Sequence, residues 1–228
     1  MVTLVSRTQP LPQPIDAVIF DLDGTLVDSS VDLQAAVNRA LAEHRLPACT
    51  HAQILAAIGD GARTLIERAM PVGRQSLVNE VHASFNRHYE ACLLDATRPY
   101  AGITDLLQSL TMPLLVVSNK PERYCRQILA GLGLAERFCG IWGGDSLSVR
   151  KPDPDSLREP LQILGLAPTQ ALMVGDGAQD VRAAQGAGLN CCGVLWGFRT
   201  QQELEASGVR WLAASPADLL AALAPSSR

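Results

Sequence analysis

The chain has 228 residues, of which 47% are hydrophobic and 18% are charged, and its formal net charge at pH 7 is −4. This length and composition allow a large apolar core and are typical of a globular, soluble protein. The negative net charge argues against a protein that coats nucleic acid, and no apolar run reaches the roughly 20 residues that cross a bilayer. We therefore expect neither a nucleic-acid partner nor a membrane partner.

The N-terminal residues and the cysteines indicate where the protein acts. Prolines interrupt residues 10–14 where a signal peptide needs an apolar stretch, so residues 1–14 are predicted to form a flexible segment. The six cysteines are scattered without Cys-x-x-Cys spacing, as expected for reduced thiols. Cys191 and Cys192 are adjacent and would point to opposite faces of a strand. These features predict a cytoplasmic protein.

Short apolar runs that end abruptly at polar residues predict buried strands. The first run covers residues 15–20, and a helical period follows through Leu33, Val37 and Leu41. Strands that alternate with helices specify an α/β class protein with a doubly wound, mainly parallel, Rossmann-like sheet. The carboxyl ends of its strands share one edge, where such sheets bind ligands. The predicted strands are 15–20, 113–117, 138–142, 171–174, 190–194 and 209–213.

The segment 28–99 has a different character from the rest of the chain. Helix-forming residues dominate it, no clear strand appears in it, and Pro99 and Gly102 interrupt the helical pattern at its far end. We predict a small α-helical cap domain that is inserted into the α/β fold. Residues 15–27 and 100–228 then form the catalytic α/β core domain.

Two carboxylates, Asp21 and Asp23, directly follow the first predicted strand. Like charges at this spacing repel each other unless a cation lies nearby. Phosphoryl transfer gives each of them a role, because one carboxylate can attack phosphorus while the other carries the proton of the leaving oxygen. A magnesium ion would offset the combined negative charge. The alternative is structural, since an aspartate at a strand end is often only a helix N-cap.

Four motifs resemble, in order and approximate spacing, those of the haloacid dehalogenase-like phosphatases. They are Asp21-Leu22-Asp23-Gly24-Thr25, Ser118-Asn119-Lys120, Lys151-Pro152 and Gly175-Asp176 with Asp180. The resemblance covers nearly the whole chain from Ile15 onward. Four motifs at the ends of successive strand units form a far more specific signal than a single Asp-x-Asp pair.

The resemblance implies a role for each matching residue. Asp21 would be the nucleophile that forms an aspartyl-phosphate, and Asp23 would be the general acid and base. Asp23 also argues against dehalogenation, because the displacement of halide requires no proton donor. Lys151 would neutralise charge between the nucleophile and the phosphoryl group and so help to bind it. Ser118 and Asn119 would donate hydrogen bonds to the phosphoryl oxygens.

The resemblance also implies Mg²⁺ as the cofactor. Its ligands would be the carboxylates of Asp21 and Asp176 and the backbone carbonyl of Asp23. Asp180 is expected to support this site without contacting the ion. Each residue taken alone also has a plain structural explanation, because Lys151 could be a solvated loop lysine and Asp180 an exposed helix residue.

A loop within the predicted cap indicates the substrate. The run Gly59-Asp60-Gly61-Ala62-Arg63 interrupts the helical region and resembles a cap loop of phosphoglycolate phosphatases, as do residues 97–100 and 196–198. The resemblance implies 2-phosphoglycolate as the substrate, with N–H groups of this loop and the Arg63 cation available for its carboxylate. Alternatively, the glycines only separate two helices, and Arg63 points into solvent.

Other accounts stay open at this point. The protein could be a phosphatase for another small or sugar phosphate, such as N-acetylmuramic acid 6-phosphate, or a phosphosugar mutase of the same superfamily. It could also be a non-catalytic binding or regulatory protein on the same fold, although every charged catalytic position is filled. The expected partner is a small-molecule phosphate ester of carbohydrate metabolism, and the sequence fits a monomer or a homodimer.

Overall fold

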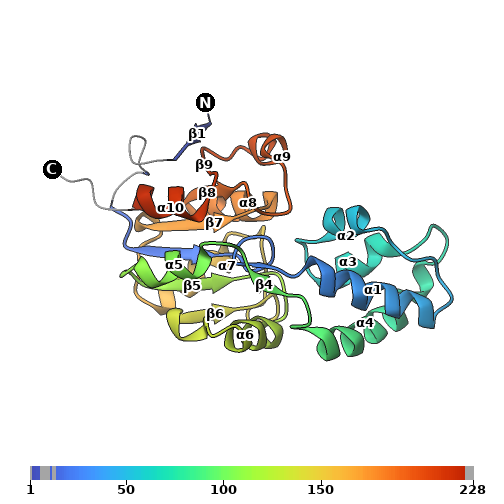
Figure 1. The fold of residues 1–228 in the computed structure, drawn as a ribbon. Coiled ribbons are helices and arrows are strands. Elements are labelled where there is room, and N and C mark those ends of the chain that lie inside the picture. Colours follow the sequence, from blue (N-terminus) through green and yellow to red (C-terminus); the bar gives the residue numbers. More distant parts are fainter. Residues whose placement is uncertain (1, 6–10, 12–13, 224–228) are drawn as a thin grey trace.

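The structure is a computed structural model that describes residues 2–5, 11 and 14–223. Figure 1 shows a sheet flanked by helices, with a separate group of helices, α1 to α4, at one end of the sheet. None of the helices in the described ranges is long and apolar enough to cross a membrane.

Seven strands form one parallel sheet in the order β1-β9-β8-β7-β2-β5-β6. From β2 the chain passes to β5 and β6 on one side, and only then to β7, β8 and β9 on the other. The strand order thus reverses beside β2, and the carboxyl ends of β5, β2 and β7 meet where such sheets open a crevice. The strands are β1 (Thr3–Leu4), β2 (Ala17–Phe20), β5 (Leu114–Val117), β6 (Gly140–Trp142), β7 (Ala171–Gly175), β8 (Asn190–Val194) and β9 (Trp211–Ala213).

Helices cover both faces of the sheet because successive strand side chains alternate between the faces. Phe20 belongs to an apolar cluster with residues of α5, α6 and α10, whereas Ile19 belongs to a second cluster with residues of α7, α8 and α9. Cys191 and Cys192 are likewise divided between the two clusters. The predicted doubly wound α/β class is confirmed. The helices are α5 (Ile103–Ser109), α6 (Glu122–Gly131), α7 (Asp155–Ile163), α8 (Ala178–Ala187), α9 (Gln201–Ala206) and α10 (Pro216–Leu223), and 3-10 turns lie at Ala135–Arg137 and Pro168–Gln170.

Residues 30–92 contain the four helices beside the sheet, which we call the helical unit. In it, α1 packs on α2 and α4, and α3 packs on the same two helices. Apolar residues at helical spacing, such as Val37 and Leu41 of α1 and Phe85 of α4, are buried between them. The helices are α1 (Ser30–Glu43), α2 (His51–Ala57), α3 (Ala62–Ala69) and α4 (Val78–Cys92), with a 3-10 turn at Gln75–Leu77.

Two connections join the helical unit to the sheet, and they lie side by side. They form a short antiparallel ladder of β3 (Val27–Asp28) and β4 (Arg98–Pro99), a pairing that the sequence did not reveal. Close to it, the buried carboxylate of Asp32 accepts hydrogen bonds from the backbone N–H groups of Ala96 and Thr97 and from the Thr97 hydroxyl, at 2.7 to 3.0 Å. The start of α1 is therefore fixed to the segment that returns to the sheet.

The N-terminal prediction was wrong in part. Residues 3–4 form β1, which pairs with the edge strand β9, and the side chains of Val5 and Leu11 are buried. The physical reason is that a short β-branched and apolar run can add to an open sheet edge without a strong sequence signal of its own. The rest of the predicted flexible segment 1–14, apart from residues 2 and 14, lies outside the described residues.

Candidate active site

Three polar side chains follow three neighbouring strands at the same edge of the sheet. Asp21 comes directly after β2, Ser118 after β5 and Asp176 after β7, and all three residues are almost fully buried. Each strand is an apolar run, and a polar residue follows its last position. The sequence pattern therefore determines that these side chains lie at the end of a strand. The parallel register then brings them together.

Lys151 lies within this group and is completely shielded from solvent. Its Nζ atom lies 3.1 Å from Oδ1 of Asp21 and 2.6 Å from Oδ1 of Asp180. Burial alone would lower the pKa of Lys151, but the two carboxylates outweigh burial and raise it. Lys151 is therefore a fixed cation beside Asp21, and neither Lys151 nor Asp180 is the solvated surface residue that the alternative interpretation allowed.

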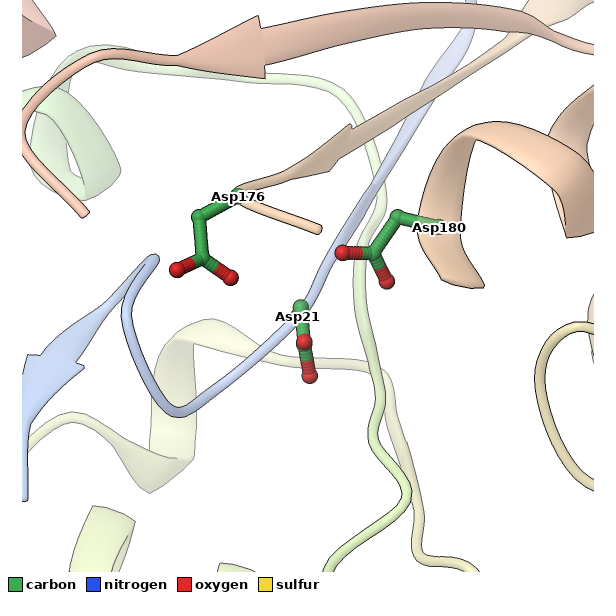
Figure 2. A group of neighbouring side chains, drawn as sticks. All are labelled: Asp21, Asp176 and Asp180. Carbon is green, nitrogen blue, oxygen red and sulfur yellow. The ribbon is translucent and has the colours of Figure 1, made fainter. Parts of the chain in front are cut away.

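Asp21, Asp176 and Asp180 form a buried acidic group, in which one carboxylate oxygen from each residue lies within 4.8 Å of the others. Figure 2 shows the three side chains close to one another, with Asp21 after β2, Asp176 after β7 and Asp180 on α8. Burial, followed by the charges of Asp180 and Asp21, raises the pKa of Asp176 to about 8, and burial also raises the pKa of Asp180. Lys151 pairs with Asp21 and Asp180 but not with Asp176, and this excess of carboxylate oxygens over cations fits a divalent cation such as Mg²⁺.

The loops around Asp176 are shaped to fit its carboxylate. Oδ2 of Asp176 accepts a hydrogen bond of 2.8 Å from the backbone N–H of Phe198. Gly24 has a φ of +81°, and a Cβ atom there would lie 2.2 Å from the same oxygen. Only glycine permits this approach, so the loops after β2 and β8 together fix the orientation of Asp176.

Asp23 is held by two side chains, neither of which was assigned a role from the sequence. Nζ of Lys120 lies 2.8 and 2.9 Å from the two carboxylate oxygens, and the hydroxyl of Ser29 donates to Oδ1 at 2.5 Å. Burial alone would lower the pKa of Lys120, but the Asp23 charge raises it. The only sequence signal for Lys120 is its place directly after Ser118 and Asn119 at the end of β5.

Ser118 and Asn119 differ in what they can offer a ligand. The Ser118 hydroxyl oxygen accepts from the backbone N–H of Lys120 at 3.3 Å, which leaves its own proton available. In contrast, the Asn119 amide nitrogen already donates to the carbonyls of Gly59 at 3.0 Å and Lys151 at 2.8 Å. Both protons of this amide are therefore used by backbone carbonyls in the structure, and the hydrogen bond from Asn119 to a phosphoryl oxygen stays a prediction. Asn119 thereby connects the sheet to the helical unit.

A cavity lies between the sheet edge and the helical unit. The space between atoms there is about 490 Å³, part of which is open to solvent. Its sheet side is charged and polar, whereas its helical side is largely apolar and aromatic. The residues that line it are Asp21, Asp23, Ser118, Asn119, Lys120, Pro121 and Tyr124 on one side, and Leu33, Ile58, Gly59, Gly61, Ala62, Leu65, Phe85 and Tyr89 on the other.

The cap loop is only partly where the sequence suggested. Gly59 and Gly61 line the cavity, but the side chains of Asp60 and Arg63 do not. Arg63 is 55% exposed at the start of α3 and pairs with Glu67 at 3.0 Å, one helical turn later. Asp60 pairs with Arg68 at 2.5 Å. The packing of α3 turns the Arg63 side chain towards solvent, so the geometry gives no support to the predicted contact of Arg63 with the substrate.

Comparisons with known proteins agree with this geometry. The family model described as haloacid dehalogenase-like hydrolase matches residues 18–194. The chain is 37% identical to a phosphoglycolate phosphatase of Yersinia pseudotuberculosis serotype I (strain IP32953), over 92% of this chain and 93% of the other. It is 39% identical to a phosphoglycolate phosphatase of Xanthomonas campestris pv. campestris (strain 8004), over 80% and 84%. The crystal structure of a predicted phosphoglycolate phosphatase from Haemophilus somnus 129pt superposes with a TM-score of 0.83 at 30% identity, covering 90% and 96% of the two chains.

Proposed function

Because the chain belongs to the haloacid dehalogenase-like hydrolase family, we propose that it hydrolyses 2-phosphoglycolate to glycolate and phosphate, with Mg²⁺ and through an aspartyl-phosphate on Asp21. One observation carries the proposal: Asp21 lies at the cavity, with a buried lysine on one of its oxygens and two further carboxylates beside it. A nucleophile, a fixed cation and an acidic group at one sheet edge are the parts that phosphoryl transfer requires.

In the first half-reaction, a carboxylate oxygen of Asp21 bonds to phosphorus, and the bond from phosphorus to the ester oxygen breaks. Lys151 and the backbone N–H of Leu22 both contact Oδ1, so we assign the attack to Oδ2. Asp23 gives its proton to the departing glycolate oxygen. Lys120 and Ser29 hold Asp23 in position for this transfer.

In the second half-reaction, Asp23 takes a proton from a water molecule whose oxygen bonds to phosphorus. The bond between phosphorus and Asp21 breaks, which releases inorganic phosphate and restores the Asp21 carboxylate, while Asp23 is again protonated. The hydroxyl of Ser118 and the ammonium of Lys151 would balance charge on the phosphoryl oxygens. Asn119 would act indirectly, by holding the loop at Gly59 over the site.

The acidic group fits the proposed cofactor. Asp21, Asp176 and the backbone carbonyl of Asp23 would hold Mg²⁺, and Asp180 lies close enough to be a further ligand or to orient the others. When bound, the ion would offset the negative charge shared by the carboxylates and the phosphoryl group. Lys151, which contacts Asp21 and Asp180, would balance a further part of that charge.

The names of similar proteins support a small substrate. Several relatives that match most of the chain are named phosphoglycolate phosphatase. In this proposal, residues 28–99 act as a cap domain that excludes water from the core domain of residues 15–27 and 100–228.

The test is phosphate release by the purified protein with Mg²⁺ from a panel of esters: 2-phosphoglycolate, N-acetylmuramic acid 6-phosphate, glucose 1-phosphate and ethyl phosphate. We expect the highest kcat/KM for 2-phosphoglycolate and loss of activity in Asp21→Asn. A higher value for a sugar phosphate would overturn the substrate, and an isomerised sugar phosphate in place of free phosphate would identify a mutase. Turnover of no ester, or undiminished turnover by Asp21→Asn, would overturn the mechanism.

A further inference from the structure

The helical side of the cavity carries one polar side chain among its lining residues, that of Tyr89. Tyr89 is 1% exposed, and its buried hydroxyl has the Lys120 ammonium, a donor, beside it but no hydrogen-bond acceptor among the described residues. Buried hydroxyls in folded proteins are nearly always paired, so one that lines a ligand cavity without an acceptor points to a group that arrives with the ligand. This observation is independent of the acidic group at the sheet edge.

The Tyr89 ring is firmly held, so its hydroxyl has a fixed place. The ring stacks on Phe85 with centroids 5.4 Å apart and meets the edge of Tyr124 at 5.3 Å. Nζ of Lys120 lies 4.7 Å from the centre of the Tyr89 ring. Tyr89 on the helical side and this ammonium on the sheet side are thus neighbours where the two sides of the cavity meet.

The position of Lys120 indicates that the Tyr89 hydroxyl and the Lys120 ammonium lie near the leaving group. Asp23 must reach the ester oxygen in the proposed reaction, and Lys120 lies 2.8 Å from the Asp23 carboxylate. The atoms that follow the ester oxygen therefore lie close to Lys120 and to the Tyr89 hydroxyl. The rest of the surrounding wall is apolar, which would disfavour a charged group anywhere else on that side.

The chemistry of the pair selects the kind of group that fits. Burial raises the pKa of Tyr89, so at neutral pH its hydroxyl is protonated and can donate a hydrogen bond. An ammonium and a neutral hydroxyl can both donate hydrogen bonds to an anionic group. A carboxylate bonded directly to the ester carbon has two oxygens that can accept them. Arg63, which was expected from the sequence to take this role, lies outside the cavity.

We propose that the Tyr89 hydroxyl and the Lys120 ammonium bind the carboxylate of the leaving group and thereby determine the preference for a carboxylated phosphate ester. This inference rests on the proposed phosphatase function. It makes Tyr89 a specificity-determining residue that contacts the organic half of the substrate, while Lys120 contacts both the carboxylate and Asp23.

The test compares kcat/KM for 2-phosphoglycolate and 2-phospholactate with that for ethyl phosphate, which has the same two-carbon leaving group without the carboxylate. Tyr89→Phe removes only the hydroxyl and keeps the ring against Lys120. We expect it to lower the ratio of phosphoglycolate to ethyl phosphate about tenfold to hundredfold, mainly through a higher KM for phosphoglycolate.

Tyr124→Phe is the matched control. Tyr124 lines the same cavity, but its hydroxyl already accepts from Arg123 at 2.6 Å and donates to the Asn86 carbonyl at 3.3 Å. This variant should keep the ratio within about twofold. Thermal unfolding adds a second readout: the Tyr89 hydroxyl has no acceptor in the ligand-free protein, so the Tm of Tyr89→Phe should not fall markedly below that of the wild type.

The outcomes separate the two proposals. If the wild type prefers phosphoglycolate and Tyr89→Phe keeps that preference, the role of Tyr89 is overturned while the proposed function stands. If the wild type prefers phospholactate, 2-phosphoglycolate is not the substrate. The ratio of kcat/KM for phospholactate to that for ethyl phosphate then tests the role of Tyr89. A wild type without preference for either carboxylated ester would overturn the inference, as would a marked fall in the Tm of Tyr89→Phe, because the hydroxyl would then have a structural partner.

Discussion

The Nζ atom of Lys151 lies 2.6 Å from Oδ1 of Asp180, and both side chains are fully buried. The same ammonium lies 3.1 Å from Oδ1 of Asp21. One cation therefore joins two carboxylates that come from different elements, the loop after β2 and the first turn of α8. Charges out of contact with water are stable only when they are paired, so these three groups depend on one another.

The first prediction is that Lys151→Met destabilises the metal-free protein by about 3 to 5 kcal/mol, because it leaves two buried carboxylates without their cation. Urea unfolding with a chelator present measures this change. The double variant Lys151→Met/Asp180→Asn should regain part of the loss, since one of the unpaired charges is then absent. A double-mutant cycle without coupling between the two positions would contradict the prediction.

The second prediction concerns pH. Burial, with the charges of Asp180 and Asp21, raises the pKa of Asp176 from 3.8 to about 8. Between these values the folded protein holds a proton on Asp176 that the unfolded chain has released. Stability falls with rising pH wherever the folded state binds more protons, so the metal-free protein should lose stability between about pH 4 and pH 8. Urea unfolding at several pH values in this range measures the change. The free energy of unfolding of Asp176→Asn should fall less steeply with pH than that of the wild type, and equal slopes would contradict a raised pKa of Asp176.

The third prediction is that Mg²⁺ stabilises the folded protein. At a concentration of one hundred times its Kd, the ion should add about 2.7 kcal/mol, which raises the Tm by several degrees for a chain of this length. Asp176→Asn should show a much smaller shift in a thermal melt. Asp60→Asn is the matched control, because Asp60 pairs with Arg68 outside the acidic group and should leave the shift intact. A shift of the same size in all three proteins would place the ion elsewhere.

The strands and the sheet-edge residues were predictable because both depend on local pattern. A buried parallel strand such as β2 or β7 is a continuous apolar run, and the first polar residue after it, Asp21 or Asp176, must lie at the carboxyl edge. β1 was missed because two residues on a sheet edge carry too little pattern to be recognised.

The residues that surround the substrate were much harder to predict. Lys120 and Asp23 are 97 positions apart, and only the fold brings them within 2.8 Å. Tyr89 follows Phe85 at i+4 on α4, a spacing that reads as ordinary core packing. Asp60 and Arg63 belong to a correctly located loop, but the direction of a side chain at the start of a helix depends on tertiary packing. The sequence pattern contains no information about that packing.

The fourth prediction follows from the position of Arg63. Its guanidinium pairs with Glu67 and donates to the Asn79 side chain at 2.9 Å, on the outside of the helical unit. Arg63→Ala should therefore change the KM for 2-phosphoglycolate by less than about twofold, and the loss of one exposed ion pair should cost less than about 1 kcal/mol. Steady-state kinetics and a thermal melt measure both quantities. A large rise in KM would contradict this prediction and indicate that Arg63 contacts the substrate.

The last prediction concerns Arg199, which reaches from the loop after β8 to the helical unit. Its Nη1 donates to the Leu55 carbonyl at 2.7 Å and its Nη2 to the Ile58 carbonyl, at the C-terminal end of α2, where carbonyls lack partners within the helix. A cation there also interacts favourably with the helix dipole. Ile58 and Gly59 line the cavity directly after this contact, so Arg199 holds their segment over the site.

Arg199→Met should therefore lower kcat/KM about tenfold or more and accelerate amide hydrogen exchange in residues 57–61, because the contact between the sheet and the cavity wall is lost. Arg68→Met is the matched control, since Arg68 also donates to a carbonyl at the end of α2, that of Ala57 at 3.2 Å, but belongs to the helical unit itself. It should loosen the same segment without releasing it from the sheet. If both variants lower kcat/KM equally, local order in the loop matters rather than the contact across the cavity. If Arg199→Met leaves both exchange and turnover unchanged, the hydrogen bond from Asn119 to the Gly59 carbonyl is a sufficient contact between the sheet and this segment.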